Sequence, residues 1–310
     1  MSKKTSAPAG SPTEGKRTRI APSRNISSIA SAGQSTGGKP TGTTASPTVQ
    51  IRMEGAVAIV TIDRRAKRNA LDGATVSALG DVFANLPKTA RAAVLCGAGE
   101  HFCAGLDLAD LGETSAAEAM FHSRLWHRSF EYIQFGRVPV VAVLHGAVVG
   151  GGLELAAATH IRVAEASTFY ALPEGQRGIF LGGGGTARLP RIIGVPTITD
   201  MMLTGRTLDA GEGLAIGLSQ YLVGAGEGFE CALQLAQTIA RNAPMTNFEV
   251  THVLPRIAEL SNEQGLLVEA MASAIVQDAP EAKERMRAFL DGRASKVKAQ
   301  IGRASCRERV

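Results

Sequence analysis

The sequence predicts an α/β protein, because segments typical of strands alternate with segments typical of helices. Apolar, β-branched runs predict strands over residues 55–62, 91–96, 138–144 and 160–164. Apolar residues at helical spacing predict helices after a cap at Asp72 and over residues 116–135, 153–158, 197–203, 226–241, 245–258, 263–276 and 280–290. Strand-like segments nearly vanish after residue 190, so we expect a sheet-bearing core followed by a helical C-terminal region.

The basic charge of the chain is concentrated at its two ends. The formal net charge is +5 over 310 residues. Residues 1–47 carry +6 and residues 293–310 carry +5, which leaves −6 for residues 48–292. An acidic central part is a poor surface for a phosphate backbone, so the sequence argues against a nucleic-acid-binding protein.

The composition of the ends also predicts the domain organisation. Residues 1–47 contain almost no apolar side chains and cannot offset the entropy of ordering, so we predict a disordered basic tail. An organellar transit peptide is the alternative, but the amphipathic pattern it needs is missing. Residues 293–310 are predicted to be a basic tail that is not native to the protein. Between the tails we expect a core at 48–250 and a helical region at 251–292.

The cysteines and the hydropathy indicate where the protein resides. Cys96, Cys103, Cys231 and Cys306 form no C-x-x-C pair or other metal-ligand spacing. A disulfide framework is unusual in a long chain with few cysteines, so we expect reduced thiols. No apolar run of about 18 residues is present, and the N-terminus lacks the apolar segment of a secretory signal. The sequence therefore predicts a cytoplasmic protein without a membrane span.

A glycine-rich segment, HGAVVGGGLELAAA at residues 145–158, lies between a predicted strand and a predicted helix. Glycine lets a ligand approach the backbone, and N–H groups at a helix start are unpaired donors, so the segment predicts an anion or oxyanion site. It does not match the dinucleotide fingerprint G-x-G-x-x-G, because the sixth residue counted from Gly150 is Leu155 instead of glycine. Neither this run nor Gly182–Gly185 continues with the Lys-Ser/Thr of a P-loop.

Two glutamates are candidates for acid and base. Glu154 lies among Gly, Leu and Ala, where an unpaired buried carboxylate is costly. Taken alone, it is equally well explained as a carboxylate that complements the helix dipole. Glu174 follows Pro173 in a loop, and taken alone it is typical of a solvated loop glutamate. The presence of both favours general acid–base chemistry.

An oxyanion hole requires a second backbone donor. The segment HFCAGLDL at residues 101–108 is a turn of small residues after a predicted strand. The N–H of Leu106 can point into the same cleft as that of Gly151, and two such donors can hold an enolate or a tetrahedral oxyanion. An ordinary loop-to-helix transition with Asp107 near the cap is the alternative interpretation.

Four segments in a fixed order resemble the crotonase family of enoyl-CoA hydratases and isomerases over about residues 50–290. They are KRNALD, HFCAGLDL, HGAVVGGGLELA and ALPEGQRGIFLGGGGTARLPRIIG. The resemblance implies a crotonase-like spiral of ββα units followed by a helical C-terminal trimerisation region. It also implies a homotrimer or homohexamer.

The resemblance assigns roles to particular residues. Leu106 and Gly151 match the donors to the thioester carbonyl, and Glu154 and Glu174 match the pair that holds the attacking water. Residues that match the substrate- and CoA-binding edge are Lys67, Arg68, Ala70, Leu71, Ala104, Asp107, Leu108, Gly150 and Pro173. Coenzyme A is part of the substrate, so no separate cofactor is implied. Arg65-Ala66 replaces the usual Pro-Glu before the lysine, a departure that affects the phosphate contacts.

Within the family, the segments YALPEGQRGIF, MMLTGR and NAPMTNF resemble the (methylthio)acryloyl-CoA hydratases of dimethylsulfoniopropionate breakdown. The expected activity is therefore hydration of an enoyl-CoA with release of methanethiol and acetaldehyde. A general short-chain enoyl-CoA hydratase is the alternative. A nucleic-acid-binding homologue of the family is an alternative of another class.

His122, Trp126 and His127 lie together on the predicted helix before the third strand. A spacing of five does not place the two imidazoles on one helix face, so no metal site is expected. We expect these residues to line the acyl pocket. A serine hydrolase is excluded by the absence of a G-x-S-x-G motif.

Overall fold

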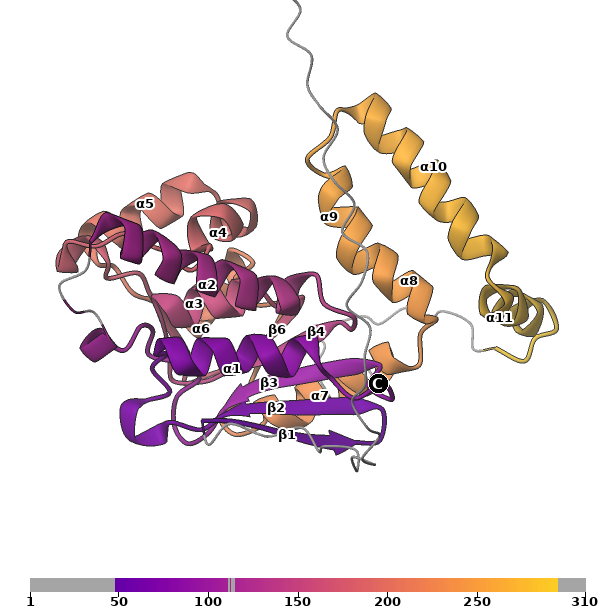
Figure 1. Cartoon of the computed structure of the whole chain (residues 1–310). Helices are drawn as coiled ribbons and strands as arrows, with labels where there is room; N and C mark the ends of the chain where they lie inside the picture. The colour runs from indigo at the N-terminus through magenta and orange to yellow at the C-terminus, as the bar shows by residue number, and fades with distance from the viewer. Residues whose placement is uncertain (1–47, 111, 113–114, 295–310) are drawn as a thin grey trace, which may run out of the picture. The chain divides into compact units, whose positions relative to one another are not determined.

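The computed structural model describes residues 48–110, 112 and 115–294. The predicted N-terminal tail, and residues 295–310 of the predicted C-terminal tail, lie outside the described residues. The described chain contains a six-stranded sheet in the order β1-β2-β3-β4-β6-β9 and a three-stranded sheet in the order β5-β7-β8 (Figure 1). The strands are β1 (Val49–Glu54), β2 (Val57–Ile62), β3 (Ala92–Gly97), β4 (Val140–Leu144), β5 (Ala147–Val149), β6 (Ile161–Glu165), β7 (Phe169–Ala171), β8 (Leu208–Asp209) and β9 (Tyr221–Val223).

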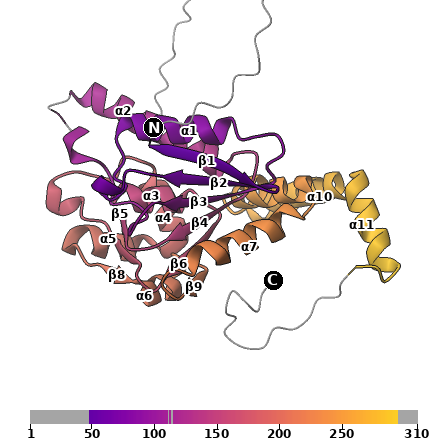
Figure 2. The same cartoon turned by 90° about the horizontal axis from the view of Figure 1, so that it is seen from below.

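Helices cover both faces of the larger sheet: α1 and α2 lie over one face and α7 over the other (Figure 2). Short 3-10 helices span Arg65–Lys67, Leu108–Asp110 and Gly175–Arg177, and the π-helix Glu249–Val253 joins α8 to α9. The α-helices are α1 (Gly73–Ala84), α2 (Ala116–Gln134), α3 (Gly151–Ala157), α4 (Gly185–Ile193), α5 (Val195–Thr204), α6 (Ala210–Ala215), α7 (Gly228–Ala240), α8 (Pro244–Phe248), α9 (Leu254–Ile257), α10 (Asn262–Asp278) and α11 (Pro280–Leu290).

Strand side chains alternate between two hydrophobic cores. In β2, Ala58, Val60 and Ile62 face the core under α1 and α2, whereas Val57 and Ile59 face the core under α7. Successive side chains of a strand point to opposite faces, and here both faces are covered. This is why the strand reads as a continuous apolar run in the sequence.

The topology brings two distant segments to one place. Strand β5 leads directly into α3, and its parallel neighbour β7 leads into the loop that carries Glu174. Parallel strands end at the same sheet edge, so the start of α3 and this loop lie side by side. The contact is fixed by a hydrogen bond of 2.9 Å from the Gly150 N–H to the Ala171 carbonyl.

The predicted α/β class and helical C-terminal region are confirmed, and Asp72 caps α1 through a bond to Thr75 N. The prediction over residues 280–290 coincides with α11. The sequence reading missed β1, four strands of only two or three residues, and the helices α4 and α6. The shorter of these elements have too few residues to show a period. The predicted boundary at residue 250 lies inside the π-helix and stays a prediction.

Of the described cysteines, Cys96 and Cys103 are free and buried. The expectation of reduced thiols agrees with the state of these two residues. Among the described helices, none has the length and apolarity needed to cross a membrane. The cytoplasmic location stays a prediction.

Asn69 ties together two loops beside the glycine-rich segments. It is fully buried and has a left-handed backbone, with φ +57°. Its side-chain amide donates to the carbonyls of Ala98, at 2.9 Å, and His101, at 2.7 Å. Its side-chain oxygen accepts from the Arg64 N–H at 2.9 Å.

We predict that Asn69→Ala lowers the free energy of unfolding by about 2–4 kcal/mol, because it leaves three partly buried partners without their bond to this side chain and strains the left-handed backbone. Urea unfolding measures the loss. The matched control is Asn85→Ala, since the exposed Asn85 makes a single side-chain bond, to the Asp81 carbonyl. Equal losses in the two variants would contradict the proposed role of Asn69.

Candidate active site

A cavity of about 320 Å³ opens at the start of α3. It is lined by both predicted glutamates, Glu154 and Glu174, and by both predicted oxyanion donors, Leu106 and Gly151. The other lining residues come from α2, from Asp110 and from residues 179–183. Four residues from three separate segments of the sequence therefore meet in one place.

Glu154 is buried and held by backbone donors. Only 3% of the residue is exposed, and its Oε1 accepts hydrogen bonds from the N–H groups of Gly183, at 2.8 Å, and Gly185, at 2.7 Å. Burial raises the pKa of this carboxyl to about 7, against the opposing effect of the two amides, and the nearby Glu174 contributes in the same direction. The group therefore exchanges a proton near neutral pH, as an acid–base catalyst must.

Glu174 presents an unsatisfied oxygen. The residue is 6% exposed, and among the described residues its Oε2 has no hydrogen-bond partner. Burial raises the pKa of this carboxyl as well. Its Oε1 lies so close to Gly150 that any side chain there would overlap it, which explains the glycine and its φ of +50°.

Leu106 and Gly151 provide backbone N–H groups at the same cavity. Within the described part of the chain neither N–H donates a hydrogen bond. A Cβ added to Gly151 would lie 3.4 Å from Leu106 N and 2.7 Å from Cζ3 of Trp126, so the two backbones approach closely and a side chain has no room. Two unpaired donors side by side can stabilise a developing oxyanion.

Part of the predicted CoA-binding edge is joined by backbone hydrogen bonds next to Leu106, where the Ala104 N–H donates to the Arg68 carbonyl. Asp107 pairs with Arg64, at 3.0 Å, and with Lys67, at 3.2 Å, and its N–H donates to the Leu71 carbonyl. Of the nine predicted residues of this edge, none lines the cavity itself. Their contact with CoA stays a prediction. The sequence reading missed Arg64, which also pairs with Asp72.

The three residues expected at the acyl pocket separate in the structure. His122 and Trp126 line the cavity, and the Trp126 indole N–H donates to Nε2 of His122 at 3.3 Å. The prediction is wrong for His127, which lines a different cavity. One residue along a helix turns the side chain by about 100°, so neighbours in sequence face different spaces.

The sequence reading also missed the two donors to Glu154, Gly183 and Gly185. A signal was present, because four consecutive glycines occupy residues 182–185. Glycine is needed here since a Cβ at Gly183 would lie 2.8 Å from the Trp126 ring and 3.0 Å from Oε2 of Glu154.

Known proteins are similar to this chain in sequence and in fold. The enoyl-CoA hydratase/isomerase family model matches residues 52–300. The chain is 34% identical over 223 residues to carnitinyl-CoA dehydratase of Proteus mirabilis (strain HI4320), covering 71% of this chain and 85% of that protein. It is 31% identical to short-chain-enoyl-CoA hydratase of Clostridium acetobutylicum, covering 79% and 95%. A candidate enoyl-CoA hydratase from Rhodopseudomonas palustris CGA009 superposes with a TM-score of 0.79 at 52% identity, covering 82% and 98%.

The fold and the paired carboxyl groups define an enzyme of the crotonase superfamily. The chain belongs to the enoyl-CoA hydratase/isomerase family. The predictions of a crotonase-like fold and of a hydro-lyase enzyme are confirmed.

The raised pKa of Glu154 predicts a cost in stability. A carboxyl with a higher pKa in the folded than in the unfolded state loses stability as the pH rises from its ordinary value, 4.5, through about 7. Glutamine keeps an acceptor for the two amides but does not ionise. We therefore predict that Glu154→Gln raises the free energy of unfolding relative to wild type, by roughly 2 kcal/mol more at pH 8 than at pH 5.

Urea unfolding at the two pH values measures this difference. Glu259→Gln is the control, since Glu259 is exposed and its pairing with Arg191 lowers its pKa. This control should show no gain in stability at pH 8. A Glu154→Gln variant that is less stable than wild type at pH 8 contradicts the prediction.

Proposed function

We propose that this protein hydrates the 2,3-double bond of an enoyl thioester of coenzyme A, with no cofactor beyond the CoA of its substrate. The observation that carries the proposal is the placement of Glu154 and Glu174 in one cavity with the free N–H groups of Leu106 and Gly151. Two carboxyl groups can hold and deprotonate a water molecule, while two N–H donors accept the negative charge on the thioester oxygen.

The contacts of the two glutamates support different roles. Glu154 receives two N–H bonds that stabilise its anion, so it is the base that removes a proton from water. The resulting hydroxide adds to C3, and the electrons of the double bond move to the thioester oxygen between Leu106 and Gly151. Glu174, whose buried Oε2 favours the neutral acid, then delivers a proton to C2.

The narrower proposal is (methylthio)acryloyl-CoA as the substrate. The cavity is small, and the Trp126 ring lines it next to Gly151 and Gly183, which suits a short acyl group. A sulfur atom gains from contact with an aromatic ring, and Trp126 offers one. The general short-chain hydratase remains the second candidate, since the same small cavity also accommodates a crotonyl group.

The chemistry of this substrate uses the same residues. Water added at the carbon that bears the methylthio group gives a hemithioacetal, which expels methanethiol and leaves an aldehyde thioester. A second water hydrolyses the thioester and releases CoA. The free aldehyde acid then loses carbon dioxide and becomes acetaldehyde.

We predict that the wild-type enzyme turns over (methylthio)acryloyl-CoA with a kcat/KM at least equal to that for crotonyl-CoA. Loss of absorbance of the conjugated thioester measures hydration, and headspace gas chromatography measures methanethiol. Glu154→Gln and Glu174→Gln should each lower turnover by about 100-fold or more, while Glu259→Gln should not. If crotonyl-CoA is hydrated rapidly while (methylthio)acryloyl-CoA does not react, the narrower proposal is wrong. Turnover of neither thioester removes the hydratase.

We also propose that the chain forms a homotrimer or homohexamer through its C-terminal helices. Apolar side chains, each more than half exposed, line α10 and α11 and need a covering surface. They are Leu266, Leu267, Met271, Ile275, Met286, Phe289 and Leu290.

Light scattering should therefore give a mass three or six times that of the 32.3 kDa chain. The double variant Leu267→Lys with Ile275→Lys should lower the mass, because burying two charges at the contact is costly. Glu263→Lys, at the start of the same helix, is the control. A wild-type mass near one chain overturns the proposal.

A further inference from the structure

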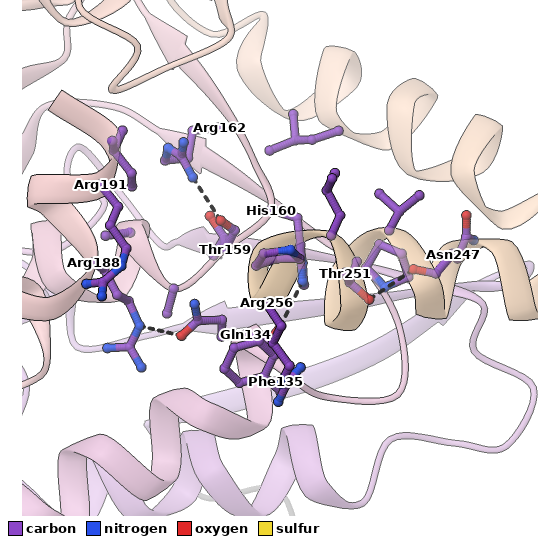
Figure 3. Close-up of a pocket in the computed structure, with 18 of the residues that line it drawn as sticks. Gln134, Phe135, Thr159, His160, Arg162, Arg188, Arg191, Asn247, Thr251 and Arg256 are labelled. Atoms are coloured by element: carbon purple, nitrogen blue, oxygen red, sulfur yellow. Dashed lines mark hydrogen bonds between the residues drawn. The ribbon is translucent and has the colours of Figure 1, made fainter. Parts of the chain in front are cut away.

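A second cavity, of about 900 Å³, is lined by Gly184 of the glycine run at residues 182–185. Figure 3 shows other residues that line it, among them Arg188 and Gln134. The ends of α2 and α3, helix α4 and the α8–α9 segment enclose it. Gly182 and Gly183 line the first cavity, whereas Gly184 lines the second. The glycine run is therefore the wall between the space that contains the two glutamates and this second space.

Arg188 reaches this wall from the second cavity. Its Nη1 donates to the Gly183 carbonyl at 3.2 Å, and its Nε donates to Oε1 of Gln134, the last residue of α2, at 2.6 Å. The half-buried guanidinium thus joins α2 to the glycine run. Its own partner on the run is an uncharged carbonyl.

The position of that carbonyl is what matters for Glu154. Along the chain it lies between the Gly183 N–H and the Gly185 N–H, which are the two donors to Oε1 of Glu154. Gly184 follows with a left-handed φ of +96°, and a side chain there would overlap the Arg188 guanidinium. Consecutive glycines have wide conformational freedom, so a fixed carbonyl restricts where both donors can point.

We propose that Arg188 is a positioning residue for hydration, which fixes the glycine run from outside the substrate cavity and thereby sets the proton affinity of Glu154. This inference rests on the proposed function only in assigning Glu154 as the base. The guanidinium acts in two ways: it aligns the two amides, and its positive charge favours the Glu154 anion.

The charges around Glu154 support this assignment. Glu174 and Arg188 are the charged groups that shift its pKa, the glutamate upward and the arginine downward. The other titratable groups that line the substrate cavity are Asp110, Glu118 and His122. Among these neighbours, Arg188 is the cation.

Removal of the guanidinium should therefore move the pH profile. In Arg188→Ala we expect the acidic limb of kcat/KM to move upward by about one pH unit, with kcat lowered about tenfold at pH 7. KM should change less than threefold, because Arg188 does not line the substrate cavity. Arg188→Lys keeps the positive charge but loses the paired contacts to the Gly183 carbonyl and Gln134. The acidic limb of its kcat/KM profile should therefore lie near that of wild type, and its kcat should fall in part.

The matched control is Arg191→Ala. Arg191 lies one turn further along α4 and lines the same second cavity, but it pairs with Glu259 at the surface and makes no bond to the glycine run. The acidic limb of the kcat/KM profile should not move in Arg191→Ala.

The second cavity is large enough to admit a free guanidinium ion, which provides a rescue experiment. Millimolar guanidinium should restore kcat in Arg188→Ala at pH 7, while an equal concentration of sodium chloride should not.

A readout without turnover keeps this inference separate from the hydratase proposal. Carbon-13 NMR of glutamate-labelled protein, with Glu154 assigned from Glu154→Gln, should show a higher pKa of Glu154 in Arg188→Ala than in wild type. An unmoved Glu154 pKa overturns the proposal, as does an equal shift in Arg191→Ala. If Arg188→Ala loses activity only because its unfolding temperature falls, and the acidic limb of its kcat/KM profile does not move, Arg188 is a structural residue and the proposal is wrong.

Discussion

The geometry of the candidate active site is arranged around one buried carboxyl group, that of Glu154. Taking a carboxylate out of water is costly, and here the compensation comes from two glycine N–H groups rather than from a direct ion pair. Backbone donors stabilise the anion without removing its capacity to take a proton. The pKa therefore settles near 7 instead of falling as it would beside an arginine in direct contact.

This compensation explains where the chain must have glycine. Gly150 leaves room for Glu174, Gly151 leaves room for Trp126, and Gly183 leaves room for both Trp126 and Glu154. The parallel pair β5 and β7 brings these segments together at one edge. The geometry of the candidate site is thus a consequence of close backbone approach, which only residues without a side chain permit.

The resemblance of their segments to one family is enough to predict that Glu154, Glu174, Leu106 and Gly151 meet in one site, whereas Glu174 taken alone is typical of a solvated loop glutamate. The fold class follows from the alternation of strand-like and helix-like segments along the sequence. The glycine run at residues 182–185 indicates a close approach of the backbone, but it does not tell which side chain its N–H groups meet, so Gly183 and Gly185 could not be predicted as the partners of Glu154. The spacing of five separates His122 from His127 on the helix, but which of the two faces the cavity depends on how the helix packs against its neighbours.

Trp126 links substrate size to the acid–base machinery. Its ring packs against Gly151, which carries one of the free N–H groups, and against Gly183, which donates to Glu154. A smaller residue at this position would enlarge the cavity but would also release both backbone segments. Acyl-chain length and the alignment of Glu154 therefore cannot be changed independently at this residue, and a wider substrate range has to come from the exposed side of the cavity, where Phe180 lies.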